Sequence, residues 1–136
     1  MTDRYMMNFL LVCNGTDPLK ELEKGLISQS GCIVTRAASG DEALTKVTDK
    51  SATFDLVIMD QTLDGASGKT WVEKIVSANP MINTALVSDL NEKDFHEETE
   101  GLGILMRISP SPDESEAAMV VERLSKVLSL YKNLGQ

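Results

Sequence analysis

The sequence predicts an α/β fold in which a parallel sheet is covered by helices. Three observations support this prediction. Five short apolar or β-branched runs alternate along the chain with stretches whose apolar residues recur at helical spacing. The middle run, Leu56, Val57, Ile58 and Met59, is unbroken, which is typical of a strand buried on both faces of a parallel sheet. Ahead of two of the helical stretches, Ser stands three residues before Glu, which is the spacing of a capping box.

The strands are predicted where apolar runs are short and lack helical spacing. Polar or Gly-containing segments follow these runs and mark turns or loops. The predicted strands cover residues 8–12, 32–37, 56–59, 83–87 and 104–108.

The first helix is predicted from a proline and a periodic apolar stripe. Pro18 suits the first position of a helix, and Thr16 or Asp17 would cap it. Gly31 ends the segment. The residues expected to face inward are Leu19, Leu22, Leu26 and Ile27.

The next three helices begin after polar capping or loop residues. Ser39 and Glu42 form a capping box for the second helix. The third begins near Lys69, and its Trp71 is expected to belong to the core. Asn91 can cap a short, polar fourth helix that extends to about residue 100.

The last helix has the clearest predicted start. Ser111 and Glu114 form a capping box, and Pro112 is expected at the first helical position. One face of this helix is apolar and is expected to cover the sheet. Its residues are Ala117, Val120, Val121, Leu124, Val127, Leu128 and Tyr131.

The order of the strands follows from the way that parallel strands are connected. Right-handed crossovers leave few topologies, and the flavodoxin-like order 2-1-3-4-5 is the commonest at this length. We therefore expect a doubly wound (βα)5 sheet, with the first and last helices on one face and the other three opposite. The 136 residues suit a single domain, 1–136, with its core at about 8–131.

The composition excludes several classes of protein. A net charge of −8 and a pI near 4.6 argue against a nucleic-acid-binding surface, which needs clustered Lys and Arg. No apolar run approaches the roughly 20 residues that span a membrane, and the amino terminus lacks a signal-peptide pattern. We therefore expect a cytoplasmic protein that binds neither nucleic acid nor membrane. Cys13 and Cys32 are expected at opposite ends of neighbouring strands, too far apart for a disulfide.

Asp60 is the candidate reactive group, because it directly follows the buried central run. In open α/β sheets, ligands bind outside the carboxyl ends of the strands. The predicted topology brings several chemically useful side chains to this edge. They are Cys13, Asn14, Asp60, Ser88, Asp89 and Ser109.

The segment around Asp60 resembles the central segment of the receiver domain of two-component response regulators. In that family an apolar strand ends in the phosphoacceptor Asp, with Pro four positions later and Gly eight positions later. Asp60 and Gly68 match this pattern, and Asp64 stands at the position of the Pro. The resemblance extends over about residues 8–131 as an ordered series of strands and helices.

The resemblance implies roles for three residues that match the family. Asp60 would accept the phosphoryl group of a phosphohistidine, and Ser88 would be the hydroxyl that bonds this group afterwards. Thr62 occupies the position that offers Mg²⁺ a backbone carbonyl. No other cofactor is implied.

The same resemblance shows where the sequence departs from the family. Cys13 and Asn14 replace an acidic pair, and Ser109, followed by Pro110, replaces a Lys. Asp60, Asn14 and Thr62 would therefore form at most a weak Mg²⁺ site, because Mg²⁺ prefers carboxylate and water oxygens. Losing these charges is expected to slow phosphoryl transfer by several powers of ten. Arg107 as a substitute cation stays open as the less favoured alternative.

The function expected from the resemblance is that of a stand-alone receiver domain in a phosphorelay, and not an enzyme. A sensor histidine kinase or phosphotransfer protein would be its phosphodonor, and an output protein would bind the face formed by the fourth helix, fifth strand and fifth helix. A homodimer through this face stays open. Two other functions also stay open, namely a phosphorylation-independent docking module of the same fold and a small-molecule-binding flavodoxin-like domain. The single Gly after the first strand argues against the latter.

Overall fold

The computed structural model describes residues 6–14, 18–29 and 31–134, with side chains up to residue 129. Its main sheet contains five parallel strands in the order β2-β1-β3-β6-β7. This is the predicted order 2-1-3-4-5, so the predicted fold is confirmed. The strands are β1 (Met7–Val12), β2 (Cys32–Ala37), β3 (Leu56–Met59), β6 (Asn83–Val87) and β7 (Met106–Ile108).

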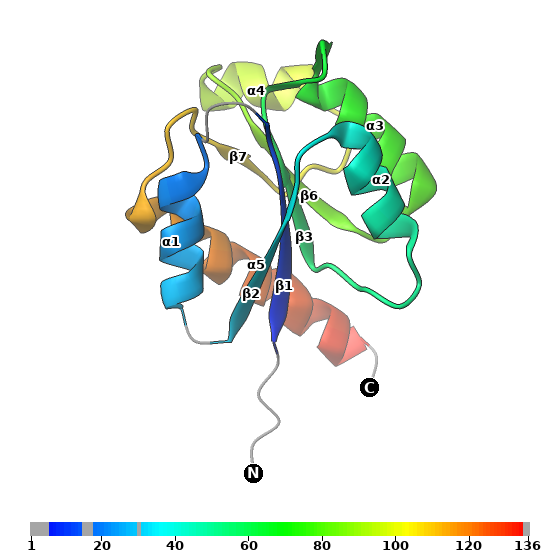
Figure 1. The fold of residues 1–136 in the computed structure, drawn as a ribbon. Coiled ribbons are helices and arrows are strands. Elements are labelled where there is room, and N and C mark those ends of the chain that lie inside the picture. Colours follow the sequence, from blue (N-terminus) through cyan, green and yellow to red (C-terminus); the bar gives the residue numbers. More distant parts are fainter. Residues whose placement is uncertain (1–5, 15–17, 30, 135–136) are drawn as a thin grey trace.

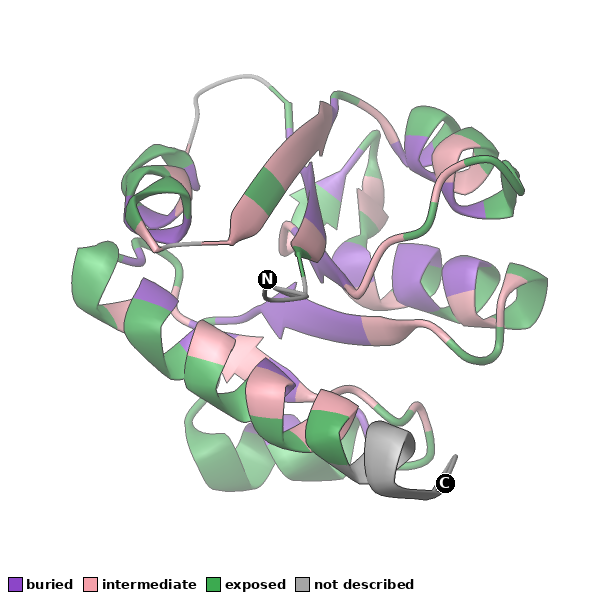
Figure 2. Ribbon diagram, turned by 90° about the horizontal axis from the view of Figure 1, so that it is seen from below, coloured by how far each residue is buried: buried purple, intermediate pink, exposed green. Residues whose placement is uncertain are grey.

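Helices cover both faces of this sheet, as predicted. The helices α1 and α5 lie together on one face, while α2 and α3 lie on the other (Figure 1). Figure 2 shows that the described helices turn their buried residues toward the sheet and their exposed residues outward. The helices are α1 (Lys20–Ser28), α2 (Gly40–Thr48), α3 (Gly68–Ala78), α4 (Glu92–Glu98) and α5 (Glu114–Leu134).

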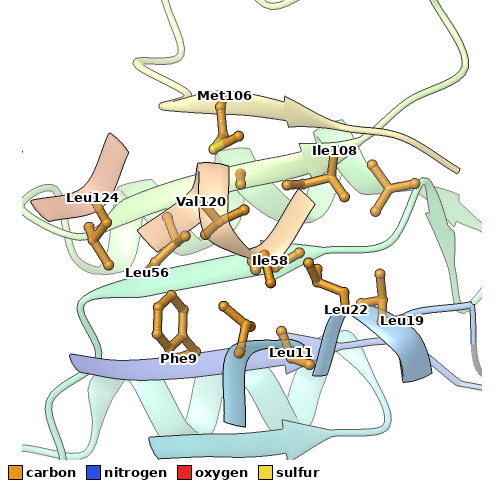
Figure 3. Packing of buried hydrophobic residues seen from close by; sticks show 14 of the residues in the cluster. Phe9, Leu11, Leu19, Leu22, Leu56, Ile58, Met106, Ile108, Val120 and Leu124 are labelled. Atoms are coloured by element: carbon orange, nitrogen blue, oxygen red, sulfur yellow. The ribbon is translucent and has the colours of Figure 1, made fainter. Parts of the chain in front are cut away.

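The central strands are buried on both faces because consecutive side chains of a strand point in opposite directions. On one face, Phe9 and Ile58 pack with Leu22 of α1 and Val120 of α5 (Figure 3). On the other face, a second cluster includes Phe95 of α4. Each of these five side chains is 0–2% exposed, and burying such a side chain contributes about 1.5–3 kcal/mol.

Trp71 belongs to the core, as predicted. Its side chain is 7% exposed, and its Nε1–H donates a hydrogen bond of 2.8 Å to the Leu63 carbonyl. The ring packs against Gly40, where a Cβ atom would lie 2.3 Å from the indole. The absence of a side chain at Gly40 therefore allows the start of α2 to contact α3.

Two helix starts predicted from proline are wrong. The first helix begins at Lys20 rather than Pro18, and its proposed caps lie outside the described residues. Leu19 is fully buried just ahead of it, so core packing sets this boundary. The last helix begins at Glu114 rather than Pro112, so the predicted capping box of Ser111 and Glu114 is wrong as well. The Asp113 carboxylate caps the helix instead, because it accepts hydrogen bonds from backbone N–H groups of the first turn, including that of Ser115 at 3.0 Å.

Other capping predictions are confirmed. The Ser39 side chain accepts a hydrogen bond from the Glu42 N–H, and the Glu42 carboxylate accepts one from the Ala38 N–H. At α4, the Asn91 side chain accepts a hydrogen bond of 2.8 Å from the Asp94 N–H. Local side-chain chemistry therefore sets these two helix starts.

The loop after Asp60 contains a hairpin that the sequence analysis did not predict. Its strands are β4 (Thr62–Leu63) and β5 (Ala66–Ser67), which pair antiparallel. The turn between them has positive φ at Asp64 (55°) and Gly65 (78°), the combination that Asp-Gly favours in two-residue hairpin turns.

Two further predictions differ from the structure. Ile27 was expected to face inward but is 57% exposed. It projects about 100° away from Leu26 around the helix, which takes it off the buried stripe. The last strand begins at Met106 instead of residue 104. Ile104 and Leu105 nevertheless pack against the two core clusters, and the Leu105 N–H donates a hydrogen bond of 2.7 Å to the Thr84 carbonyl of β6, so contact with β6 begins just before the strand itself.

Neither Cys13 nor Cys32 forms a disulfide bond. The strand register pairs Met7 with Cys32 and Val12 with Ala37, so Cys13 and Cys32 lie at opposite ends of β1 and β2. Across the described part of the chain, no helix combines the length and apolar character needed to cross a membrane.

Candidate functional site

Asp60 lies at the carboxyl end of β3, where the sequence placed it. Its N–H donates a hydrogen bond of 3.0 Å to the Val12 carbonyl, which continues the pairing of β1 and β3. One carboxylate oxygen accepts a bond of 2.7 Å from the Gln61 N–H. Burial raises the pKa of Asp60 above its ordinary value, and the Gln61 bond offsets this only in part. The site therefore contains a half-buried carboxylate whose charged form is incompletely solvated.

This raised pKa predicts how stability depends on pH. Between pH 3.8, the ordinary pKa, and the raised pKa, the folded protein holds the Asp60 proton more often than the unfolded chain. The stability contributed by this group therefore falls as pH rises through that window, and the ionised carboxylate stays unfavourable above it. We expect Asp60→Asn to unfold at a higher urea concentration than the wild type at pH 7, and this advantage to disappear below about pH 3.8.

Glu73→Gln is the charge-matched control, because Glu73 is an exposed carboxylate on α3. It should leave the urea midpoint at pH 7 almost unchanged. An Asp60→Asn protein that is less stable than the wild type at pH 7 would contradict the expected cost of burying this charge.

Asn14, at the end of β1, is bound to the hairpin that follows Asp60. Its side-chain amide donates a hydrogen bond of 3.0 Å to one oxygen of Asp64. The other oxygen of Asp64 accepts a bond of 2.8 Å from the Gly40 N–H. This N–H lies in the first turn of α2, where a helix dipole favours negative charge. Asp64 thus connects β1, the hairpin and α2.

Ser88 follows β6 and is 5% exposed. Its hydroxyl oxygen accepts a hydrogen bond of 3.1 Å from the Leu90 N–H, and its carbonyl accepts one of 2.8 Å from Nη1 of Arg107. Nε of Arg107 also donates to Glu92 at 3.2 Å. These contacts agree with the favoured alternative, in which Arg107 does not act as a substitute cation.

Ser109, at the end of β7, is held by a carboxylate from α5. Its N–H donates to Glu116 at 2.7 Å, and its hydroxyl donates to the other oxygen of Glu116 at 2.6 Å. The position where the receiver resemblance implies a lysine therefore carries a hydroxyl that is bound to a negative charge.

Asp89 and Thr62, which were also predicted, lie at the same edge of the sheet as Asp60. The side chain of Gln61 donates a hydrogen bond of 3.0 Å to Asp89, which connects the ends of β3 and β6. Thr62 is exposed and lies in β4, opposite Ser67. The sheet thus brings together the strand ends that carry Asn14, Asp60, Ser88 and Ser109.

The contacts made by Gln61, Asp64 and Glu116 were not predicted from the sequence. Asp64 was noted only as a departure from the proline pattern. Its position before Gly65 is a hairpin signal that would have placed the turn. Glu116 lies in the first turn of a helix, where an acidic residue is common, so nothing in its spacing indicated Ser109 as a partner.

The side chains near Asp60 fit a magnesium ion poorly. Within the described ranges, no three His, Cys, Asp or Glu side chains gather closely enough to hold a metal ion. The nearby Asn14 offers only a neutral amide, and its nitrogen is bound to Asp64. Magnesium prefers several carboxylate and water oxygens, so this set of donors is a weak one.

Comparisons with known proteins support a single family. A family model described as the response regulator receiver domain matches residues 10–120. The chemotaxis response regulator CheY4 of Vibrio cholerae is similar, with a TM-score of 0.73 and 20% identity over 88% of this chain and 98% of that one. The signal receiver domain of an HD domain-containing protein from Pseudomonas fluorescens Pf-5 gives a TM-score of 0.77 and 21% identity over 97% and 96%.

A receiver domain protein (CheY-like) from Methanospirillum hungatei JF-1 has a TM-score of 0.73 and 20% identity, covering 89% of this chain and 95% of that one. At these identities the likeness to solved structures shows the fold alone. No curated protein sequence gives a significant match to the chain.

Proposed function

Because the chain belongs to the response regulator receiver domain family, we propose that it acts in two-component signalling through Asp60 as a weakly supported phosphoacceptor. Receiver domains partner with histidine kinases and are generally signalling modules rather than catalysts. This family membership decides against the small-molecule-binding alternative. The phosphodonor in this proposal is a sensor histidine kinase or a phosphotransfer protein.

The observation that carries the proposal is the position of Asp60. Its half-buried carboxylate follows the central strand, and its backbone is held by the Val12 carbonyl on one side and by close contact with Gly68 on the other. A carboxylate held in this way at a sheet edge is suited to in-line attack, since phosphoryl transfer depends mainly on positioning and charge neutralisation.

In the proposed step, an oxygen of Asp60 attacks the phosphorus of a phosphohistidine. The P–N bond breaks, the imidazole nitrogen leaves with the bonding pair, and an acyl phosphate forms on Asp60. The hydroxyl of Ser88 is the nearest counterpart of the family's switch residue. Ser109 gives no positive charge, and Glu116 beside it adds a negative one. Electrostatic support of this kind is worth several kcal/mol, so the step is slow.

Incubation with acetyl phosphate, followed by intact mass measurement, tests this proposal. We expect the wild type to gain one phosphoryl group slowly, at a rate that changes little when Mg²⁺ is omitted. Asp60→Asn should gain none, because it lacks the nucleophile. A wild-type mass that stays unmodified with and without Mg²⁺ would remove Asp60 as a working phosphoacceptor.

A second candidate function is a docking module that does not need phosphorylation. Hydrogen bonds within the chain already connect the strand ends around the site to neighbouring segments. They join Asn14 to Asp64, Gln61 to Asp89 and Ser109 to Glu116. An edge held in this way favours one conformation without a phosphoryl group. An unmodified mass, together with equal partner binding by the wild type and Asp60→Asn, would favour this function.

The proposed contact surface for an output protein is the cleft between α4, β7 and α5. It encloses about 440 Å³. Met119, which is 56% exposed, offers apolar area, while Arg107 and Arg123 bring positive charge and Glu92 and Glu116 bring negative charge. A mixed surface of this kind suits a partner with both apolar and charged groups, including a second copy of the chain.

A further inference from the structure

Arg107 joins the edge of the candidate site to the output face. It lies on β7, and its side chain is 23% exposed. Nη1 donates a hydrogen bond of 2.8 Å to the Ser88 carbonyl, while Nε donates one of 3.2 Å to the Glu92 carboxylate. Ser88 directly follows β6 at the edge of the site, and Glu92 is the first residue of α4. One guanidinium group therefore contacts both the site edge and the start of the helix.

The two contacts of Arg107 differ in strength. The Ser88 carbonyl is part-buried, and Ser88 is also held to β7 by its N–H, which donates to the Ile108 carbonyl at 3.0 Å. A hydrogen bond from a charged donor to a part-buried acceptor is stronger than an exposed ion pair. The Glu92 side chain is 66% exposed, so its ion pair with Arg107 is screened by salt. The hydrogen bond to Ser88 is thus the stronger of the two contacts, and the ion pair with α4 is the one that breaks more easily.

A guanidinium group suits a connection of this type. Its N–H donors form a rigid planar fork, so a displacement of the acceptor at one nitrogen turns the whole plane and changes the geometry at the other. Within the described residues, Arg107 makes the side-chain contact that links Ser88 to α4.

We propose that Arg107 is a positioning residue that couples the position of Ser88 to the placement of α4. The inference rests on the proposed function, because phosphorylation of Asp60 would be the event that moves Ser88. When the Ser88 carbonyl moves, the guanidinium follows it and the contact with Glu92 loosens. The output face then changes with the placement of α4.

Hydrogen exchange of the unphosphorylated protein tests the placement of α4. Arg107→Ala should speed exchange in residues 88–98 roughly tenfold, since the charge-assisted bonds that hold the start of α4 are lost. Arg107→Lys should give an intermediate result, because an ammonium group lacks the planar fork. Arg123→Ala is the matched control, since Arg123 lines the same cleft and should leave this exchange unchanged.

The Nε–H signal of Arg107 in ¹⁵N NMR tests the coupling itself. Glu92→Gln removes the charge at one end of the connection. Ser88→Ala keeps the carbonyl that Arg107 binds but removes the hydroxyl that accepts from the Leu90 N–H, and so releases the backbone that positions this carbonyl. Each variant should shift the Arg107 signal while the Arg123 signal stays in place. Added salt should speed exchange in α4 of the wild type but not of Arg107→Ala. Glu92→Gln removes the charge that faces Arg107 and His96 at the surface but leaves the Arg107–Ser88 bond in place, so it tests the connection even if Arg107→Ala fails to fold.

The inference is overturned if Arg107→Ala and Arg123→Ala have the same effect on α4, or if the Arg107 signal responds to Glu92→Gln but not to Ser88→Ala. None of these measurements uses phosphorylated protein. Failure of the acetyl phosphate assay would therefore count against Asp60 as phosphoacceptor and would leave the result on Arg107 intact.

Discussion

Replacing Gly68 with Ala is expected to destabilise the protein by roughly 3 kcal/mol, the upper end of the usual cost of overpacking a core. A Cβ atom at this position would lie 2.1 Å from the Asp60 carbonyl oxygen and 2.7 Å from Cδ1 of Leu86. The carbonyl belongs to the backbone at the end of β3 and cannot rotate away. The N–H of Gly68 also donates a bond of 2.7 Å to the Gln61 carbonyl, so α3 cannot retreat without losing it.

Urea unfolding measures this effect, and Gly101→Ala supplies a control with a different cause. Gly101 has a φ of +88° and no atom within 4 Å of its Cβ position, so alanine there meets backbone strain but no clash. That strain costs about 1–2 kcal/mol. If Gly68→Ala were no more destabilising than Gly101→Ala, the close approach to Asp60 would not be what requires glycine. The clash also gives a physical reason for glycine eight residues after Asp60.

Restoring charge to the site is expected to produce the largest change in activity. The triple variant Asn14→Asp, Ser109→Lys, Glu116→Gln should gain a phosphoryl group from acetyl phosphate at least about a hundredfold faster than the wild type, with a clear requirement for Mg²⁺. Aspartate at position 14 adds an oxygen ligand that Mg²⁺ prefers, and lysine at position 109 adds the missing positive charge. Aspartate at position 14 also loses the hydrogen bond to Asp64 and faces its carboxylate, a repulsion that a bound cation would offset and that strengthens the expected requirement for Mg²⁺. Each electrostatic contribution of this kind is worth roughly 10²–10³ in rate.

The change at Glu116 is essential to this design. Both oxygens of the Glu116 carboxylate bind Ser109, so a lysine introduced alone at position 109 would pair with Glu116 instead of facing Asp60. We therefore expect Ser109→Lys alone to change the labelling rate much less than the triple variant. Intact mass over a time course measures both. Equal rates for the triple variant and the wild type would mean that charge loss is not what limits Asp60.

The strands and the caps of two helices were predictable because their signals are local. The unbroken run from Leu56 to Met59 and the capping residues Ser39 and Asn91 each act within a few residues, and the structure confirms them. The two proline-based helix starts were wrong for different reasons, a tertiary contact at the first helix and a competing local cap at the last. Burial of Leu19 and capping by Asp113 moved the boundaries toward the carboxyl terminus.

The position of Asp60 was predictable for the same reason, since it directly follows the buried central strand. The environment of Asp60 was not. Asn14 binds Asp64 across 50 residues, and Arg107 reaches Ser88 across 19. Hydrogen bonds between single side chains at such separations leave no periodic pattern in the chain.

Composition, apolar periodicity and capping chemistry were enough to specify an α/β domain with Asp60 at the end of its central strand, because burial and capping act on each segment separately. The partners of Asn14, Ser88 and Ser109 depended on how the strand ends meet at one edge of the sheet. Only folding brings the carboxylates of Asp64 and Glu116 and the guanidinium of Arg107 within hydrogen-bonding distance of these residues.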